Sequence, residues 1–277
     1  MKLYKIKDGI VIQKENLFYK VDDDWDTFIN DDNLFDKMET MSQKSAPINN
    51  GKKLIETNLE APINSQELWA SGVTYFRSKQ GRQEESKKAG GADFYQHVYE
   101  AERPELFFKA TSNRIIGSGG KVKIRKDSIW NVPEPELTLL ITSNEKIIGY
   151  TIGNDMSSRS IEGENPLYLP QAKTYDGCAA LGPCVYITKE QLPANTLIDL
   201  KILRNGKIAF EGDVQINQIK RSFEELASFL YRECTFPNGS YLMTGTGIVP
   251  GSDFTLQSGD VIKITIDKIG TLVNEVE

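Results

Sequence analysis

The sequence predicts an α+β protein that is mostly β, and three observations support this class. Short segments of alternating or continuous apolar residues recur along most of the chain, as expected of strands. Turn residues separate these segments, and only one strongly amphipathic helical pattern interrupts the later ones. The chain of 277 residues suits one large domain or two unequal ones. We place a boundary near residue 65, between a small N-terminal domain (1–65) and a larger domain (66–277).

The N-terminal domain is expected to open with three strands, because its first segments are rich in β-branched and aromatic residues. These segments are KLYKIK (2–7), GIVIQ (9–13) and LFYKV (17–21). An acidic stretch (22–41) follows, with apolar residues at loosely helical spacing. Residues 47–64 are rich in turn residues, and the segment LWASGVTYF (68–76) after them predicts a buried strand.

Residues 77–101 are strongly polar and contain the pair Gly90-Gly91 between two helix-like pieces. Two interpretations stay open for this segment. It is either a solvated loop and helix or a mobile lid over a site.

From Leu106 onward the pattern is mostly that of strands, in LFFKA, KVKIR, ELTLLIT, KIIGYTIG, CVYIT, LIDLKILRNGKIAFEGDVQI and DVIKITIDKIG. Asn205-Gly206 predicts a two-residue hairpin turn, because both residues tolerate positive φ angles. The one convincing helix is SFEELASFLYREC, for which Ser222 is a suitable N-cap.

Composition excludes several classes of function. The net charge of -6 argues against nucleic-acid binding, which needs a basic surface. No apolar run reaches the roughly 20 residues of a membrane helix, and the N-terminus has no signal-peptide core, so cytoplasm is expected. The single histidine, His97, leaves no material for a histidine-rich zinc site. Acid–base chemistry must therefore rest mainly on carboxylates, lysine or tyrosine.

The segment NVPEPELTLLI places Glu134 and Glu136 two residues apart, so both project from the same face of a strand. If the next turn pairs Ser143 with Lys146, Asp155 lies opposite Glu134, and Gly153 lies opposite Glu136. We expect Gly153 to leave room at the centre of the three carboxylates. Three crowded carboxylates need a cation, and hard oxygen ligands favour Mg²⁺, with Mn²⁺ or Ca²⁺ as substitutes. A 2-oxo acid can fill two open positions on such an ion. The alternative is that Glu134 and Glu136 merely solvate an edge strand.

Several segments, in this order along the chain, resemble the fumarylacetoacetate hydrolase superfamily: SGVTYFRS, RPELFFKA, PEPELTLLI, GYTIGNDMSSRSIEGENPLYLPQAK and TGTGIVP. The resemblance covers roughly residues 66–277. RPELFFK and IEGENPLYLPQAK further resemble the branch that contains 2-keto-3-deoxy-D-arabinonate dehydratase. The resemblance implies a fumarylacetoacetase-like mixed β-roll and a homodimer or homotetramer.

The resemblance also implies a site in which Glu134, Glu136 and Asp155 ligate Mg²⁺. Lys173 matches the active-site lysine of the family and Arg159 its usual arginine. The remaining residues expected to bind substrate are Thr246, Gly245, Tyr75 and Ser78. Alternatively, Lys173 and Arg159 are ion-pair partners of Glu162 or Glu164, and Thr244–Gly247 is an ordinary tight turn.

The sequence departs from hydrolytic relatives at one point that bears on chemistry. Those relatives carry a histidine for water activation, whereas TYFRSKQGRQEES has none. This favours dehydration of a 2-keto-3-deoxy sugar acid, of the arabinonate or xylonate type, to 2,5-dioxopentanoate through a stabilised enolate. Lys173, with a pKa lowered by burial, is the expected base, and Glu84 or Glu85 the expected acid.

Three alternatives remain at this point. They are a C–C bond hydrolase of a 2,4-dioxo acid, an oxaloacetate decarboxylase or tautomerase, and a non-catalytic protein that binds a 2-oxo acid or a metal.

Overall fold

The computed structural model describes the backbone of residues 1–85 and 92–277, and their side chains except those of residues 84, 85 and 92–94. Most of the ordered elements in these ranges are strands, which form two mixed sheets as predicted. The larger sheet runs in the order β3 (Leu17–Val21), β2 (Gly9–Lys14), β1 (Lys2–Ile6), β10 (Ala179–Ile187), β9 (Ile147–Ser158), β8 (Asn131–Ile141), β13 (Ser240–Met243), β4 (Glu67–Gly72), β5 (Glu105–Thr111), with β6 (Ile115–Ile116) on β10.

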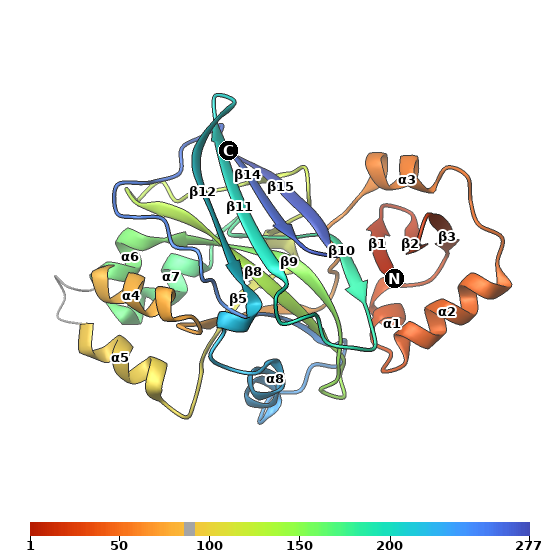
Figure 1. The fold of residues 1–277 in the computed structure, drawn as a ribbon, viewed down its shortest axis with the longest axis horizontal. Coiled ribbons are helices and arrows are strands. Elements are labelled where there is room, and N and C mark those ends of the chain that lie inside the picture. The colour runs from red at the N-terminus through yellow and green to blue at the C-terminus, as the bar shows by residue number, and fades with distance from the viewer. Residues whose placement is uncertain (86–91) are drawn as a thin grey trace.

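The smaller sheet has the order β12 (Lys207–Gln215), β11 (Leu197–Arg204), β14 (Val261–Ile266), β15 (Gly270–Val276), β7 (Lys121–Val122). Its strands cross in front of the larger sheet in Figure 1, and the apolar residues between them form one core. Leu137 and Ile152 of the larger sheet share this core with residues of the smaller sheet such as Leu200. Residues 205 and 206 both have positive φ, as the predicted type I′ turn requires.

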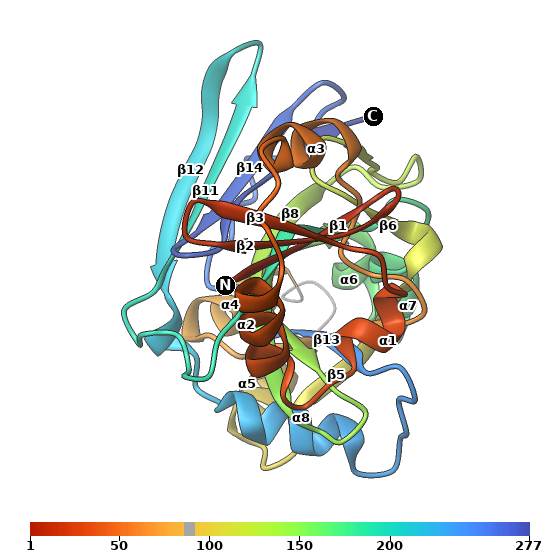
Figure 2. The same ribbon diagram turned by 90° about the vertical axis from the view of Figure 1, so that its right-hand side faces the viewer.

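The helices gather in three places (Figures 1 and 2). One group, beside β1–β3, consists of α1 (Trp25–Ile29), α2 (Leu34–Lys44) and α3 (Gly51–Asn58). A second group lies at the opposite end of the molecule and consists of α4 (Phe76–Glu85), α5 (Ala92–Glu100), α6 (Arg159–Glu164) and α7 (Leu169–Lys173). The predicted helix near residue 222 is α8 (Phe223–Tyr231), and Ser222 caps it by accepting a hydrogen bond from the amide of Glu225. Among the described residues, no helix is both long and apolar enough to cross a membrane.

The first three strands belong to the larger sheet, because β1 pairs with β10 through Lys2–Tyr186 and Leu3–Val185. Apolar residues of α1 and α2 cover the outer face of that sheet in a second core, which includes Phe28, Leu34 and Met38. The boundary near residue 65 stays a prediction.

The β8–β9 hairpin has the predicted register in its central part, where Glu134 pairs with Asp155 and Glu136 with Gly153. The predicted turn is wrong by one residue. The amide of Thr142, not Ser143, bonds to the carbonyl of Lys146 at 2.9 Å. A register shift follows between Leu140 and Ile141, and this β-bulge restores the predicted pairing toward the site.

The two prolines of β8 do not interrupt this ladder, although β8 is an interior strand. The carbonyl of Leu137 accepts from Thr244 and that of Asn131 from Leu256, so odd-numbered backbone groups face away from β9. Pro133 and Pro135 are odd-numbered, and β13 pairs only with residues 138–141. Their missing amide hydrogens therefore cost no bond to either neighbouring strand.

Gly153 serves a different purpose from the one expected. A Cβ there would overlap Thr138 Oγ1 and lie 2.7 Å from Met243 Cε. The glycine therefore admits these two side chains beneath the site rather than leaving space among the carboxylates.

We expect Gly153→Ala to destabilise the protein by about 1–3 kcal/mol, because the added methyl group has no room and must displace the neighbouring side chains. Urea unfolding measures this change. Gly251→Ala is the matched control, since its Cβ would meet only the carboxylate at the end of the Asp253 side chain. Equal stability of the two variants would contradict the packing explanation.

Candidate active site

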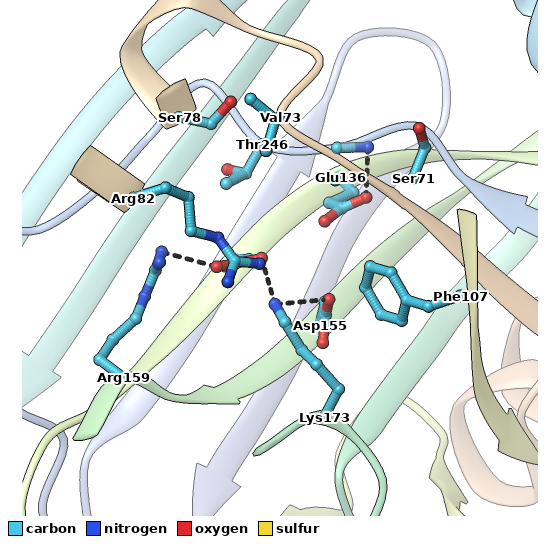
Figure 3. Close-up of a pocket in the computed structure, with 13 residues that line it drawn as sticks. Ser71, Val73, Ser78, Arg82, Phe107, Glu136, Asp155, Arg159, Lys173 and Thr246 are labelled. Atoms are coloured by element: carbon cyan, nitrogen blue, oxygen red, sulfur yellow. Dashed lines mark hydrogen bonds and ion pairs between the residues drawn. The ribbon is translucent and has the colours of Figure 1, made fainter. Parts of the chain in front are cut away.

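Three carboxylates converge on one buried face of the β8–β9 hairpin, as the strand pattern predicts. One oxygen each from Glu134, Glu136 and Asp155 lies within 4.8 Å of the other two. All three residues are buried, so the group is not a solvated strand face (Figure 3). Hard oxygen donors at this spacing are suited to a Mg²⁺-like ion.

Lys173 and Arg159 reach the carboxylates from α7 and α6. The ammonium of Lys173 donates to Glu134 Oε2 at 2.7 Å, to Asp155 Oδ2 at 2.9 Å and to Ser157 Oγ at 2.6 Å. Arg159 Nη2 lies 2.6 Å from Glu134 Oε1. Lys173 and Arg159 also form the ion pairs with Glu162 that the alternative predicted, each with a nitrogen–oxygen distance of 3.4 Å.

Local structure explains how Arg159 arrives there. The strand β9 runs directly into α6, and the side chain of Ser158 caps that helix by accepting from the amide of Ile161. Arg159 is the first residue of α6, so it returns toward the strand that carries Asp155.

The Thr244–Gly247 segment contacts the carboxylate group, and its role in substrate binding stays a prediction. The amide of Gly245 donates to Glu136 Oε2 at 2.5 Å, so it orients a carboxylate of the group. Gly245 has φ +93°, and a Cβ there would overlap Thr74 Oγ1. Thr246 lines the pocket, while its hydroxyl bonds within the turn to the backbone of Ile248 at 3.2 Å.

Ser78 and Tyr75 lie close to the group but differ in position. Ser78 lines the pocket, and its hydroxyl donates to the carbonyl of Tyr75 at 2.7 Å. Tyr75 is buried, and its hydroxyl has no hydrogen-bond partner among the described residues. Burial and the nearby Glu136 raise the pKa of Tyr75 above its usual value.

The carboxylates differ in protonation. Burial, with the charges of Asp155 and Glu134, raises the pKa of Glu136 well above its usual value. Burial also opposes ionisation of Glu134, but Lys173 and the two nearby arginines outweigh it and lower the pKa of Glu134. The group therefore has a site at Glu136 where a bound cation replaces a proton.

The expectation of a lowered pKa for Lys173 is wrong for the protein without a metal ion. Burial lowers the pKa, but the charges of Asp155, Glu134 and Glu162 together outweigh it, and the pKa of Lys173 is raised. The sequence argument counted desolvation and left out the carboxylates that the fold places against the ammonium.

The structure adds charged residues that the sequence analysis did not single out. Arg82 of α4 lines the pocket and pairs with Glu162 at 3.0 Å, both side chains being buried. Lys109 of β5 is fully buried, lies 2.5 Å from Asp155 Oδ1 and donates to the carbonyls of Met156 and Lys173. Arg82 stands in no local pattern that marks such a role, whereas Glu162 was expected only as a possible ion-pair partner of Lys173 and Arg159.

Glu105 is a further carboxyl group beside the pocket. A Cβ on Gly72, a pocket residue, would overlap the Glu105 carboxylate, and Glu105 Oε2 is buried without a hydrogen-bond partner among the described residues. Burial raises its pKa. Glu105 and Lys109 both belong to RPELFFKA, a segment noted for its resemblance, and that was the only signal in the sequence.

The acid residues and the glycine pair expected in the polar segment 77–101 are not tested by the structure. The side chains of Glu84 and Glu85, and the Gly90-Gly91 pair, lie outside the described residues. The two helix-like pieces are present as α4 and α5, and His97 is exposed on α5.

The chain is similar to known proteins in sequence and in fold. Residues 74–277 match the family model described as fumarylacetoacetate (FAA) hydrolase C-terminal. The chain is 46% identical over 225 residues to 2-dehydro-3-deoxy-D-arabinonate dehydratase of Saccharolobus solfataricus, covering 80% of this chain and 75% of that protein. It is also 46% identical over 224 residues to a probable 2-keto-3-deoxyxylonate dehydratase of Haloferax volcanii, covering 80% and 76%.

A solved structure of 2-keto-3-deoxy-D-arabinonate dehydratase complexed with magnesium and 2,5-dioxopentanoate is similar to the whole chain. Its TM-score is 0.84 at 37% identity, with 100% of this chain and 99% of that chain covered. The chain therefore belongs to the fumarylacetoacetate hydrolase family.

We expect Glu136→Gln to weaken Mg²⁺ binding by at least about 100-fold, because it removes an anionic ligand from a group of three. Isothermal titration calorimetry measures the affinity. Glu145→Gln, in the exposed turn of the same hairpin, is the control and should bind as the wild type does. Similar affinities for both variants would place the ion elsewhere.

Mg²⁺ binding should also release protons, because the raised pKa of Glu136 favours a protonated carboxyl group whose proton the ion displaces. The affinity should accordingly rise with pH. Titrations in buffers of different ionisation enthalpy count the protons. Release that is undiminished in Glu136→Gln would assign the proton to another group.

Proposed function

We propose that this member of the family is a Mg²⁺-dependent hydro-lyase that dehydrates a 2-keto-3-deoxy sugar acid of the arabinonate or xylonate type to 2,5-dioxopentanoate. The observation that carries the proposal is the buried group of Glu134, Glu136 and Asp155, with cations on one side and a protonatable carboxyl, Glu105, on another. The likeness to two dehydratases along most of the chain supports the same reaction.

The position of the only histidine supports dehydration over hydrolysis. His97 is exposed on α5, and the sequence contains no other histidine to activate a water molecule. Elimination of water needs no nucleophilic water, only removal of a proton and departure of a hydroxyl group.

The described residues fit a bound Mg²⁺, which would be held by Glu134, Glu136 and Asp155. When bound, Mg²⁺ supplies Lewis-acid polarisation of the 2-keto group and acidifies the C3 protons. Arg159 lines the same pocket and attracts the substrate carboxylate. Lys173, held by Glu134 and Asp155, adds positive charge where negative charge develops on the substrate.

Dehydration needs one group that takes a C3 proton and one that protonates the departing C4 hydroxyl. Lys173, which contacts Glu134 and Asp155, is one candidate for the first step, and Glu105, a carboxyl group beside the pocket, is the other. Glu84 or Glu85 could supply the acid. Loss of water gives an unsaturated 2-oxo acid, and tautomerisation through the C5 hydroxyl carbon yields the 2,5-dioxo acid.

Other expectations belong to the same proposal. Mn²⁺ or Ca²⁺ substitutes for Mg²⁺, the protein acts in the cytoplasm, and it assembles as a homodimer or homotetramer. Residues 77–101 contribute either a solvated loop and helix or a mobile lid over the site, and residues 1–65 form a separate small domain.

The proposal is tested by incubating the protein with 2-keto-3-deoxy pentonate and hexonate stereoisomers, with Mg²⁺ or with EDTA. We expect a dioxo acid of unchanged carbon number, formed only with the metal and detected by NMR. Two acids would indicate C–C hydrolysis, and carbon dioxide from oxaloacetate would indicate decarboxylation. Binding of pyruvate without turnover of any substrate would indicate a non-catalytic protein, and activity in EDTA would contradict the metal.

We expect Glu105→Gln to lower kcat by about 100-fold to 10,000-fold, because it removes a proton-transfer group. Its Mg²⁺ affinity should stay close to that of the wild type, since Glu105 is not among the three candidate ligands. Lys173→Met should also lower kcat. If either variant kept near-normal turnover and normal metal content, the residue it replaces would have no role in proton transfer.

A further inference from the structure

A second cavity, of about 180 Å³, lies next to the metal pocket among α4, α5, α6 and α7. Its walls include the apolar side chains of Tyr95, Val98 and Leu169, and its charged side is formed by Arg82, Glu105 and Glu162. The helices that surround it lie together at one end of the molecule (Figure 1).

The two spaces are adjacent and differ in size. Arg82 lines both of them, and Glu105 of the larger cavity lies against Gly72 of the metal pocket. The metal pocket has room for only about 10 Å³, roughly one water-sized sphere. A space of that size can hold an ion and the substrate oxygens that contact it. The carbons of a five-carbon acid that lie farther from the ion therefore need another space.

The chemistry of the cavity selects the kind of group that fits. Arg82 offers hydrogen-bond donors and Glu105 an acceptor, which together match a hydroxyl group. The apolar walls suit the C–H faces between hydroxyl groups. Glu105 and Glu162 make the cavity unsuitable for a second carboxylate.

We propose that this cavity is the subsite for the distal, hydroxylated carbons of the substrate, and that Arg82 and Val98 determine substrate length and polarity there. The proposal rests on the proposed function and extends it to specificity. It predicts that the protein favours monocarboxylic acids with a hydroxylated tail over dicarboxylic acids such as oxaloacetate.

The test uses binding rather than turnover. The probe is 5-hydroxy-2-oxopentanoate, which has the distal hydroxyl but no C4 hydroxyl to eliminate, and pyruvate is the reference that lacks the tail. Both are titrated calorimetrically into the Mg²⁺-loaded protein. The wild type should bind the probe at least about tenfold more tightly than pyruvate.

Two variants alter the cavity and one serves as the control. Val98→Phe fills it and Arg82→Met removes its donors, so each should weaken probe binding at least about tenfold. Val98→Phe should leave pyruvate binding within about twofold. His97→Phe adds the same ring to the exposed side of α5 and should change neither affinity.

Three results would overturn the subsite: equal affinity of the wild type for probe and pyruvate, equal loss of both in Val98→Phe, or unchanged probe binding in that variant. Failure of the proposed function is a separate result. If the probe binds in this cavity-dependent way and 2-keto-3-deoxy pentonates are not dehydrated, the subsite stands and the reaction does not.

Discussion

Three carboxylates, those of Glu134, Glu136 and Asp155, lie on one buried face of the β8–β9 hairpin, and their mutual repulsion is the constraint on which the rest of the structure depends. Without compensation, ionised groups at this spacing would not remain together in the interior. The fold compensates with cations drawn from several elements and with a raised pKa at Glu136.

The compensation also connects distant parts of the fold. Lys109 lies on β5, an edge strand, and its ammonium contacts Asp155 and the backbone of Met156 and Lys173. It thereby ties the edge of the larger sheet to β9 and α7. Lys173 in turn holds two of the carboxylates, so a single chain of polar contacts fixes the position of both the acidic group and the lysine.

The metal pocket and its neighbouring cavity contact different parts of the substrate in the proposed complex. The pocket is small, and its three carboxylates stand on the paired strands β8 and β9, which keep them at fixed spacing. The cavity is larger, partly apolar and built on helices, and Arg82 belongs to both. Chemistry common to many 2-oxo acids can therefore stay at the strands while the helices determine which acid is accepted.

The sequence alone determined the mostly β class, the shared face of Glu134 and Glu136, and the pairing of Glu134 with Asp155. The shared face follows from the strand period of two, which is a local property of the chain. The pairing was predicted from the turn, and it is correct near the site because the β-bulge offsets the misplaced turn. The turn was misplaced by one residue, because a β-bulge leaves no clear local pattern. Only the tertiary structure decided that Arg82, Glu105, Lys109 and Glu162 surround the carboxylates. These residues come from elements far apart in the sequence, and their approach depends on how the sheet and helices pack.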